Sequence, residues 1–108
     1  MVVLKAMMQL LDKLTNTHDQ NYITLTIRNL MKGDKKTKMF FYENGGTAKF
    51  CQIILESEDL GMVEMCMNAL AEQSSYKKFV VKVLSSPKDL EMLQCVIKRV
   101  LELSNTWF

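Results

Sequence analysis

The chain is poor in proline, glycine, histidine and cysteine, with one proline, four glycines, one histidine and three cysteines in 108 residues. The scarcity of proline and glycine excludes collagen-like and low-complexity chains. His18 stands alone, and Cys51, Cys66 and Cys95 lie too far apart in the sequence for ordinary zinc-ligand spacing. We therefore expect one packed globular domain over residues 1–108, with no metal and no cofactor.

An excess of charge of one sign is also absent, because 14 basic and 12 acidic residues leave a net charge of +2. This balance does not predict strong non-specific attraction to nucleic acid. Lys5, Asp12 and Lys13 interrupt the apolar start of the chain, so we expect no membrane insertion. The cysteines lie in apolar stretches typical of buried free thiols, which indicates a reducing, cytoplasmic or nuclear location.

What the sequence does have is an apolar period of 3.6 residues along nearly its whole length. Strict alternation of apolar and polar residues is almost lacking, so the pattern predicts an all-α fold of six to seven short helices. With their caps, the predicted helices span 1–13, 17–32, 35–42, 48–55, 57–73, 76–84 and 86–104.

Capping residues and apolar faces refine these helices. Thr17 and Gln20 are spaced as a reciprocal capping box, and Ser86 before Pro87 is typical of a helix start. Asn44, Gly45 and Gly46 predict a turn. The periods place the following side chains in the core or on the last apolar stripe: Tyr22, Ile23, Thr26, Ile27, Leu30, Met39, Phe40, Tyr42, Phe79, Val80, Val83, Leu90, Leu93, Val96, Ile97, Val100 and Leu101.

An internal repeat emerges when the sequence is shifted by forty residues. The shift aligns Leu10 with Phe50, Leu14 with Ile54, Asp19 with Asp59, Ile23 with Val63, Ile27 with Met67, Leu30 with Leu70, Met39 with Phe79, and Phe40 with Val80. It divides the chain into repeats at about 1–34, 35–74 and 75–105 and predicts that Leu30 and Leu70 are equivalent core positions.

The segment 36–75 resembles the armadillo repeat and its HEAT relatives. Asn44-Gly45-Gly46 looks like the turn between the first two helices of that repeat, and Met62–Ala71 looks like its third helix. Ile27-Arg28-Asn29-Leu30 is similar to the end of the third helix in the preceding repeat. The resemblance implies a right-handed superhelix of about two and a half repeats. So few repeats are also what a fragment of a longer solenoid would contain.

The same resemblance implies a non-catalytic interaction module or scaffold that binds a protein or peptide segment along a concave helical surface. It assigns partner binding to Asn29 and, by alignment, to Glu72. Arg28, Asn68 and Arg99 are neighbouring candidates. No nucleophile with a base, paired carboxylates or phosphate loop can be assembled from the sequence, so we expect no enzyme activity.

Two further features leave alternatives open. Lys35, Lys36 and Lys38 recur one repeat later as Lys77 and Lys78, and such a basic edge could meet an acidic peptide or a phosphate backbone. A helical bundle that binds nucleic acid is one alternative function, although nucleic acid is the less favoured partner. Trp107 and Phe108 could contact another chain, so a subunit that stacks end to end, as a homo- or hetero-oligomer, is the other.

Overall fold

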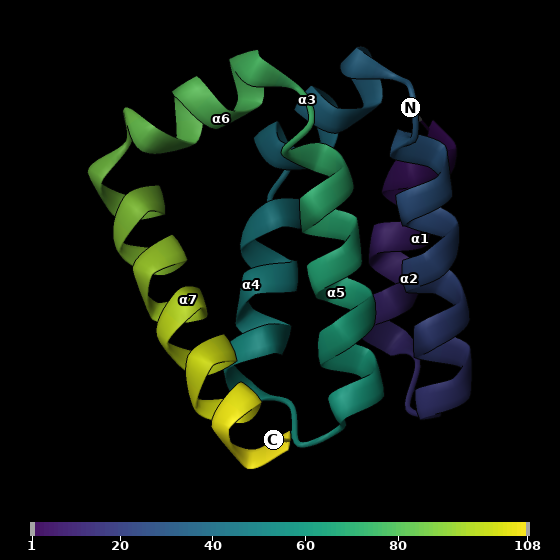
Figure 1. Ribbon diagram of the computed structural model, residues 1–108. Coiled ribbons are helices and arrows are strands. Elements are labelled where there is room, and N and C mark those ends of the chain that lie inside the picture. The colour runs from purple at the N-terminus through teal and green to yellow at the C-terminus, as the bar shows by residue number, and fades with distance from the viewer. Residues whose placement is uncertain (1, 108) are drawn as a thin grey trace.

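The computed structural model describes the backbone of residues 2–107 and the side chains of residues 2–105. Within these residues the chain is all-α with seven helices, as the apolar period predicts. The helices are α1 (Val2–Lys13), α2 (Thr17–Met31), α3 (Lys35–Glu43), α4 (Gly46–Glu56), α5 (Leu60–Gln73), α6 (Lys77–Leu84) and α7 (Pro87–Trp107). Figure 1 shows α3 and α6 lying across one end of the longer helices.

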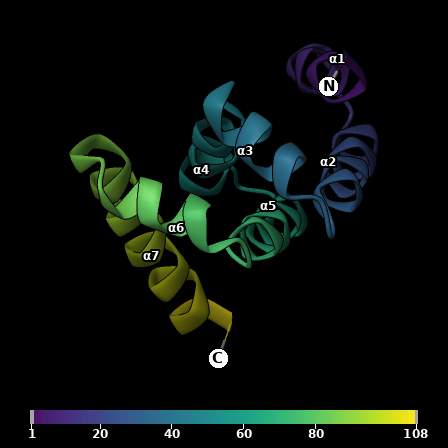
Figure 2. The ribbon, with the colours of Figure 1, turned by 90° about the horizontal axis from the view of Figure 1, so that it is seen from above.

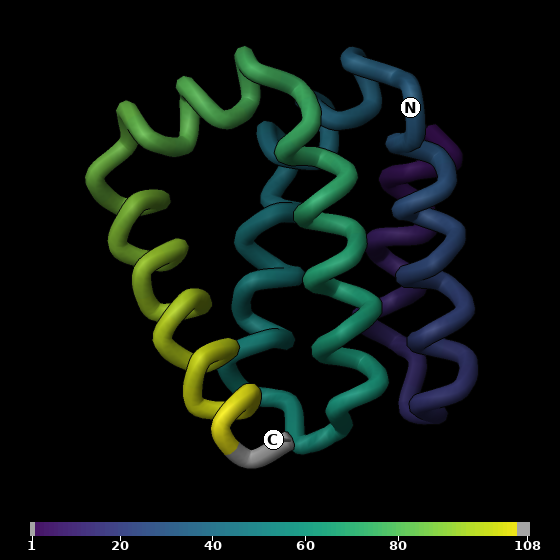
Figure 3. Tube along the Cα trace, in the orientation of Figure 1, coloured from purple at the N-terminus to yellow at the C-terminus, as the bar shows by residue number. Residues whose placement is uncertain are grey.

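The longer helices pack side by side in an order that differs from their order in the chain. α1 packs against α2, α2 against α5, α5 against α4, and α4 against α7 (Figure 2). The tube in Figure 3 shows that the chain turns back sharply between α4 and α5, whereas α7 continues as far as Trp107 without such a turn. Consequently α5 lies against two neighbouring helices, α2 and α4.

Most of the core residues come from α2, α4 and α5, and α3 contributes Phe41. The ring of Phe41 is fully buried and packs edge-on against Phe50, with ring centroids 4.9 Å apart. The turn predicted at Asn44–Gly46 is present, and Gly45 adopts a left-handed φ of 84°. The sequence placed Met39, Phe40 and Tyr42 inward, but these three side chains are only half-buried. Because α3 crosses the end of the other helices, Phe41 is the one apolar side chain among the described residues of α3 that is fully buried, and Thr37 and Lys38 are buried beside it.

The start of α2 differs from the predicted capping box. Asn16, not Thr17, is the N-cap, and its side-chain oxygen accepts hydrogen bonds from the backbone N–H groups of His18 and Asp19 at 2.8 and 3.3 Å. Gln20 donates to the carbonyl of Leu14 at 2.7 Å instead of reaching back to Thr17. The helix therefore begins one residue earlier, at Thr17.

The buried face of α2 also differs from the prediction. Thr24, Ile27 and Met31 are buried, whereas Tyr22 is exposed and Leu30 is 37% exposed, so the core position predicted for Leu30 is wrong. Thr24 can be buried because its hydroxyl donates to the carbonyl of Gln20 at 2.9 Å. Met31 thus takes the buried place that the pattern gave to Leu30, and Thr24 is buried on the same helix.

Buried positions recur with a spacing of forty-two residues, not forty. Pairs with this separation are buried at both members: Thr24 and Cys66, Ile27 and Ala69, Met31 and Gln73, Thr37 and Phe79, Phe41 and Val83, and Ile54 and Val96. The forty-residue shift instead pairs exposed Leu10 with buried Phe50 and exposed Leu30 with half-buried Leu70. These positions, paired by the forty-residue shift, are therefore not equivalent in burial.

We predict that Gly46→Ala destabilises the protein by about 1–3 kcal/mol, because a Cβ at Gly46 would lie 2.3 Å from ring atoms of Phe41. Chemical denaturation followed by circular dichroism measures this loss. Phe41→Leu makes room for the methyl group, so the double variant should lose less stability than the sum of the two single variants. Additive losses would contradict the proposed steric conflict.

Candidate functional site

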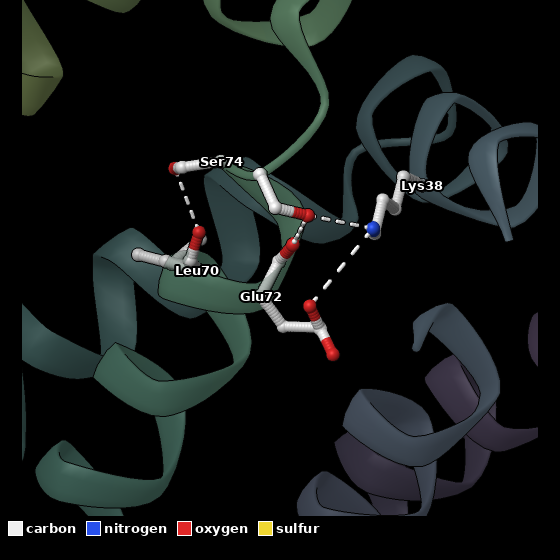
Figure 4. A network of polar contacts seen from close by, with 5 residues as sticks. Lys38, Leu70, Glu72 and Ser74 are labelled. Carbon is white, nitrogen blue, oxygen red and sulfur yellow. Dashed lines mark hydrogen bonds and ion pairs between the residues drawn. The ribbon is translucent and has the colours of Figure 1, made fainter. Parts of the chain in front are cut away.

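A buried lysine connects α3 to the turn after α5. The side chain of Lys38 is only 6% exposed. Its ammonium donates to Ser75 Oγ at 2.8 Å and lies 3.9 Å from Glu72 Oε2 (Figure 4). The hydroxyl of Ser75 in turn donates to the carbonyl of Glu72 at 2.8 Å. The prediction that Lys38 belongs to an exposed basic edge is therefore wrong, because its ammonium is buried and interacts with Ser75 and Glu72.

A second buried polar contact holds three helices together. Gln73, the last residue of α5, is fully buried. Its amide nitrogen donates to the carbonyl of Lys38 at 3.0 Å, and its side-chain oxygen accepts from the hydroxyl of Thr47 at 3.0 Å. These bonds join α3, α4 and α5 and satisfy polar groups that burial would otherwise leave without a partner.

The predicted partner-binding residues do not form one cluster. Glu72 lies in the last turn of α5 beside Lys38, whereas Arg99 donates to the carbonyl of Ser57, just before the start of α5, at 3.2 Å. Glu72 and Arg99 therefore lie near opposite ends of α5, and both are half-buried and bonded within the protein.

The two predicted asparagines are differently placed. Asn29 on α2 and Asn68 on α5 are exposed, and these two helices pack against each other. Neither amide has a hydrogen-bond partner among the described side chains. Arg28 is half-buried next to Asn29. The asparagines thus remain available to a ligand at the outer surface of α2 and α5.

The rest of the predicted basic edge is exposed. Lys35 and Lys36 begin α3, and Lys77 and Lys78 begin α6. The ammonium of Lys35 lies over the ring of Tyr76 at 5.9 Å from its centroid, which brings the starts of the two helices together. The predicted end contact cannot be placed in the same way, since the Trp107 side chain and Phe108 lie outside the described residues.

An apolar pocket lies where α5, α6 and α7 meet, and together with the exposed apolar side chains farther along α7 we call it the groove. The pocket has a volume of about 80 Å³ and is lined among others by Leu70, Leu84 and Leu93. Farther along α7, Ile97 is 52% and Leu101 60% exposed, although the sequence placed both on a continuous apolar stripe with the buried Val96. The sequence pattern identified Ile97 and Leu101 as apolar stripe residues, but it could not predict that both would remain exposed.

Two buried thiols and one tyrosine have raised pKa values. Burial raises the pKa of the Cys66 thiol to about 12 and that of the Cys51 thiol to about 11. The Tyr42 hydroxyl donates to the Asp89 carboxylate, which raises the tyrosine pKa to about 12 and joins α3 to α7. Thiols and phenols with such high pKa values are poor nucleophiles at neutral pH.

No metal-binding group of three or more His, Cys, Asp or Glu side chains occurs in residues 2–105. His18 is exposed at the start of α2. Among the same residues, the helices are too short or too polar to span a membrane. Comparison of the chain with protein-family models, with curated proteins and with solved structures found no match.

We predict that the three thiols differ sharply in reactivity. All three cysteines are free, but Cys51 and Cys66 are buried and Cys95 is exposed, which corrects the expectation that all three are buried. Thiol labelling of the native protein at neutral pH should modify Cys95 quickly and the other two only after unfolding. Mass spectrometry of the labelled peptides identifies the sites. Rapid native labelling of Cys66 would contradict the described core.

We also predict that Gln73→Met lowers stability by about 1–3 kcal/mol, because it keeps the side-chain volume but leaves the Lys38 carbonyl and the Thr47 hydroxyl without their partner. Thermal unfolding measures the change. The control is Ser74→Ala, which removes an exposed hydroxyl bonded to the carbonyl of Leu70 (Figure 4). The two variants should differ clearly, and equal midpoints would rule out a structural role for the buried amide.

Proposed function

We propose that this chain is a non-catalytic protein-interaction module with armadillo/HEAT-like helical repeats, and that it holds an amphipathic helix of a partner protein between α5 and α7. The observation that carries the proposal is the line of exposed apolar side chains along α7 beside an apolar pocket. Exposed apolar side chains that adjoin an apolar pocket form the kind of contiguous surface that is typical of interaction sites.

The repeat spacing supports a helix as the occupant. A shift of forty-two residues takes α2 to α5 and α4 to α7. α5 packs against both α2 and α4. The same shift would therefore place a further helix against both α5 and α7. Among the described residues, that place is left open because α7 does not turn back as the chain does after α4 (Figure 3).

Individual positions support the same conclusion. Under this shift Leu93 and Ile97 of α7 correspond to Cys51 and Leu55 of α4. Cys51 is buried and Leu55 is half-buried against the core, whereas Ile97 is 52% exposed. A partner helix with apolar side chains three and four residues apart would cover Ile97 and insert one side chain into the pocket.

The size of the pocket favours a side chain over a small-molecule ligand. Its volume of about 80 Å³ is far below the roughly 300–1,000 Å³ that accommodates a drug-sized molecule. The high pKa values of Cys51, Cys66 and Tyr42 likewise support a binding role over covalent or acid–base chemistry near the groove.

A second candidate function is recognition of an extended peptide along α2 and α5. It is supported by the exposed amides of Asn29 and Asn68, which can donate to and accept from a peptide backbone. End-to-end stacking of copies of the chain is distinguishable from both, because it makes the mass in solution depend on concentration.

We predict that Ile97→Asp combined with Leu101→Asp abolishes partner binding while leaving the thermal midpoint nearly unchanged, because both side chains are exposed. The partner is identified by affinity capture, and the affinity of its helical segment is then measured by calorimetry. Val3→Asp on α1 is a matched control, since Val3 and Leu101 are both 60% exposed.

Three results would redirect this assignment. Loss of binding in Asn29→Ala but not in the α7 variant would favour the extended-peptide surface. Equal loss in Val3→Asp and in the α7 variant would remove the groove as a specific site. Light scattering that shows concentration-dependent mass, abolished by the α7 substitutions, would favour end-to-end stacking.

A further inference from the structure

We infer that the outer face of α6 is a second docking surface, separate from the groove, and that it receives an acidic protein segment carrying an apolar side chain. We call this surface the α6 basic face and define it by Lys77, Lys78 and Lys82 together with Val81 of the same helix and Met39 of α3. Seen from above, α6 and α3 lie across the end of the longer helices (Figure 2).

The α6 basic face is a shallow depression with an apolar floor and a basic rim. Its lining includes Met39, Val81 and the three lysines of α6. Val81 is 63% exposed, and all three lysines are exposed. A lone carboxylate would use only the rim and a lone apolar side chain only the floor. A ligand that carries both uses the whole depression.

The charge around this depression is predominantly positive. α6 contains three lysines and no acidic residue, and exposed Lys35 and Lys36 extend the positive charge onto α3. The nearest acids on α3 are at its two ends: Asp34 caps the helix by accepting from the Thr37 N–H, and Glu43 is the last residue. Charge complementarity therefore favours an acidic occupant.

The lysine pairs oppose the local electrostatics of their own helices. Lys35 and Lys36 begin α3, Lys77 and Lys78 begin α6, and neither helix has an acidic residue in its first turn. A helix N-terminus carries partial positive charge, so lysine there is unfavourable for folding. These four lysines therefore do not stabilise their helices through the dipole. Lys35 contacts the ring of Tyr76, and a binding role explains the placement of Lys77 and Lys78 better than a structural one.

The apolar floor distinguishes an acidic protein segment from other anionic ligands. Nucleic acids are commonly held by stacking on aromatic rings, but the nearby Tyr76 is half-buried with Lys35 over its ring. A membrane surface needs a broad apolar face, whereas the eight residues of α6 offer this depression only one strongly exposed apolar side chain, Val81. A peptide with acidic residues on both sides of one leucine matches the depression in charge and in shape.

The test uses the full chain and a fluorescein-labelled synthetic peptide in which glutamates flank a single leucine. Fluorescence anisotropy should show binding that weakens as salt is raised. Lys77→Glu with Lys78→Glu should weaken it by roughly tenfold or more, without lowering the thermal midpoint. Val81→Ser should also weaken it, and should remove the preference for leucine over serine at the centre of the peptide.

Matched controls separate this surface from net charge and from the groove. Lys5→Glu with Lys98→Glu changes the net charge equally at exposed positions on α1 and α7 and should leave peptide binding unchanged. The Ile97→Asp, Leu101→Asp variant should also retain it, so failure of the groove proposal and failure of this one give different results.

Several outcomes would overturn the inference. These are peptide binding that is unaffected by the Lys77 and Lys78 reversals, or an equal loss in the Lys5, Lys98 control. A single-stranded oligonucleotide or phosphatidylserine vesicles that bind the same lysines more tightly than the peptide would also overturn it, in favour of nucleic acid or membrane.

Discussion

The contact between the ring of Phe41 and the backbone of Gly46 fixes the position of α3, on which both candidate surfaces depend. A nine-residue helix buries little area of its own, so its position must be set by a few specific contacts. Phe41 enters the core only because Gly46 has no Cβ, and Gln73 then bonds the carbonyl of Lys38 three residues before Phe41. With α3 held in this way, Met39 faces α6 and Tyr42 reaches Asp89 of α7.

The spacing of forty-two residues relates the two ends of the protein to each other. Val83 occupies in α6 the place that Phe41 occupies in α3, and Val96 occupies in α7 the place of Ile54 in α4. The smaller valine fills less of its site than the phenylalanine does, and the apolar pocket beside Val83 is consistent with that difference in volume. The equivalence weakens beyond residue 98, where α7 continues as a helix through the positions that correspond to the link between α4 and α5. Helices that are well packed at one end of the protein and incompletely covered at the other give the groove its apolar character.

The sequence predicted the helices far better than it predicted which of their residues are buried. Period, caps and turns located all seven helices within a few residues, because these signals are local. Burial depends on how the helices cross, and a period alone cannot distinguish Leu30 from Met31 or Phe40 from Phe41 when both neighbours are apolar. The burial of Lys38 and Gln73 could not be predicted from the sequence for another reason. Polar residues are buried only where partners satisfy them, and these partners lie twenty-six to thirty-seven residues away in the chain. Asn29 and the lysines at the helix starts, which protrude from helix surfaces, could be placed from the sequence alone.

The eight residues of α6 show how one short helix contributes to three different environments. Phe79 and Val83, four residues apart, enter the core, and Phe79 packs edge-on against Tyr42 at 5.4 Å between ring centroids. Val80 comes directly after Phe79, Leu84 comes directly after Val83, and both line the apolar pocket. Lys77, Lys78, Val81 and Lys82 occupy the remaining arc and form the basic face. Because the helical period of 3.6 residues separates these sets, the groove and the basic face share a helix but no side chain. Substitutions on the basic face can therefore leave Phe79 and Val83 undisturbed, whereas the pocket is lined in part by these same two residues.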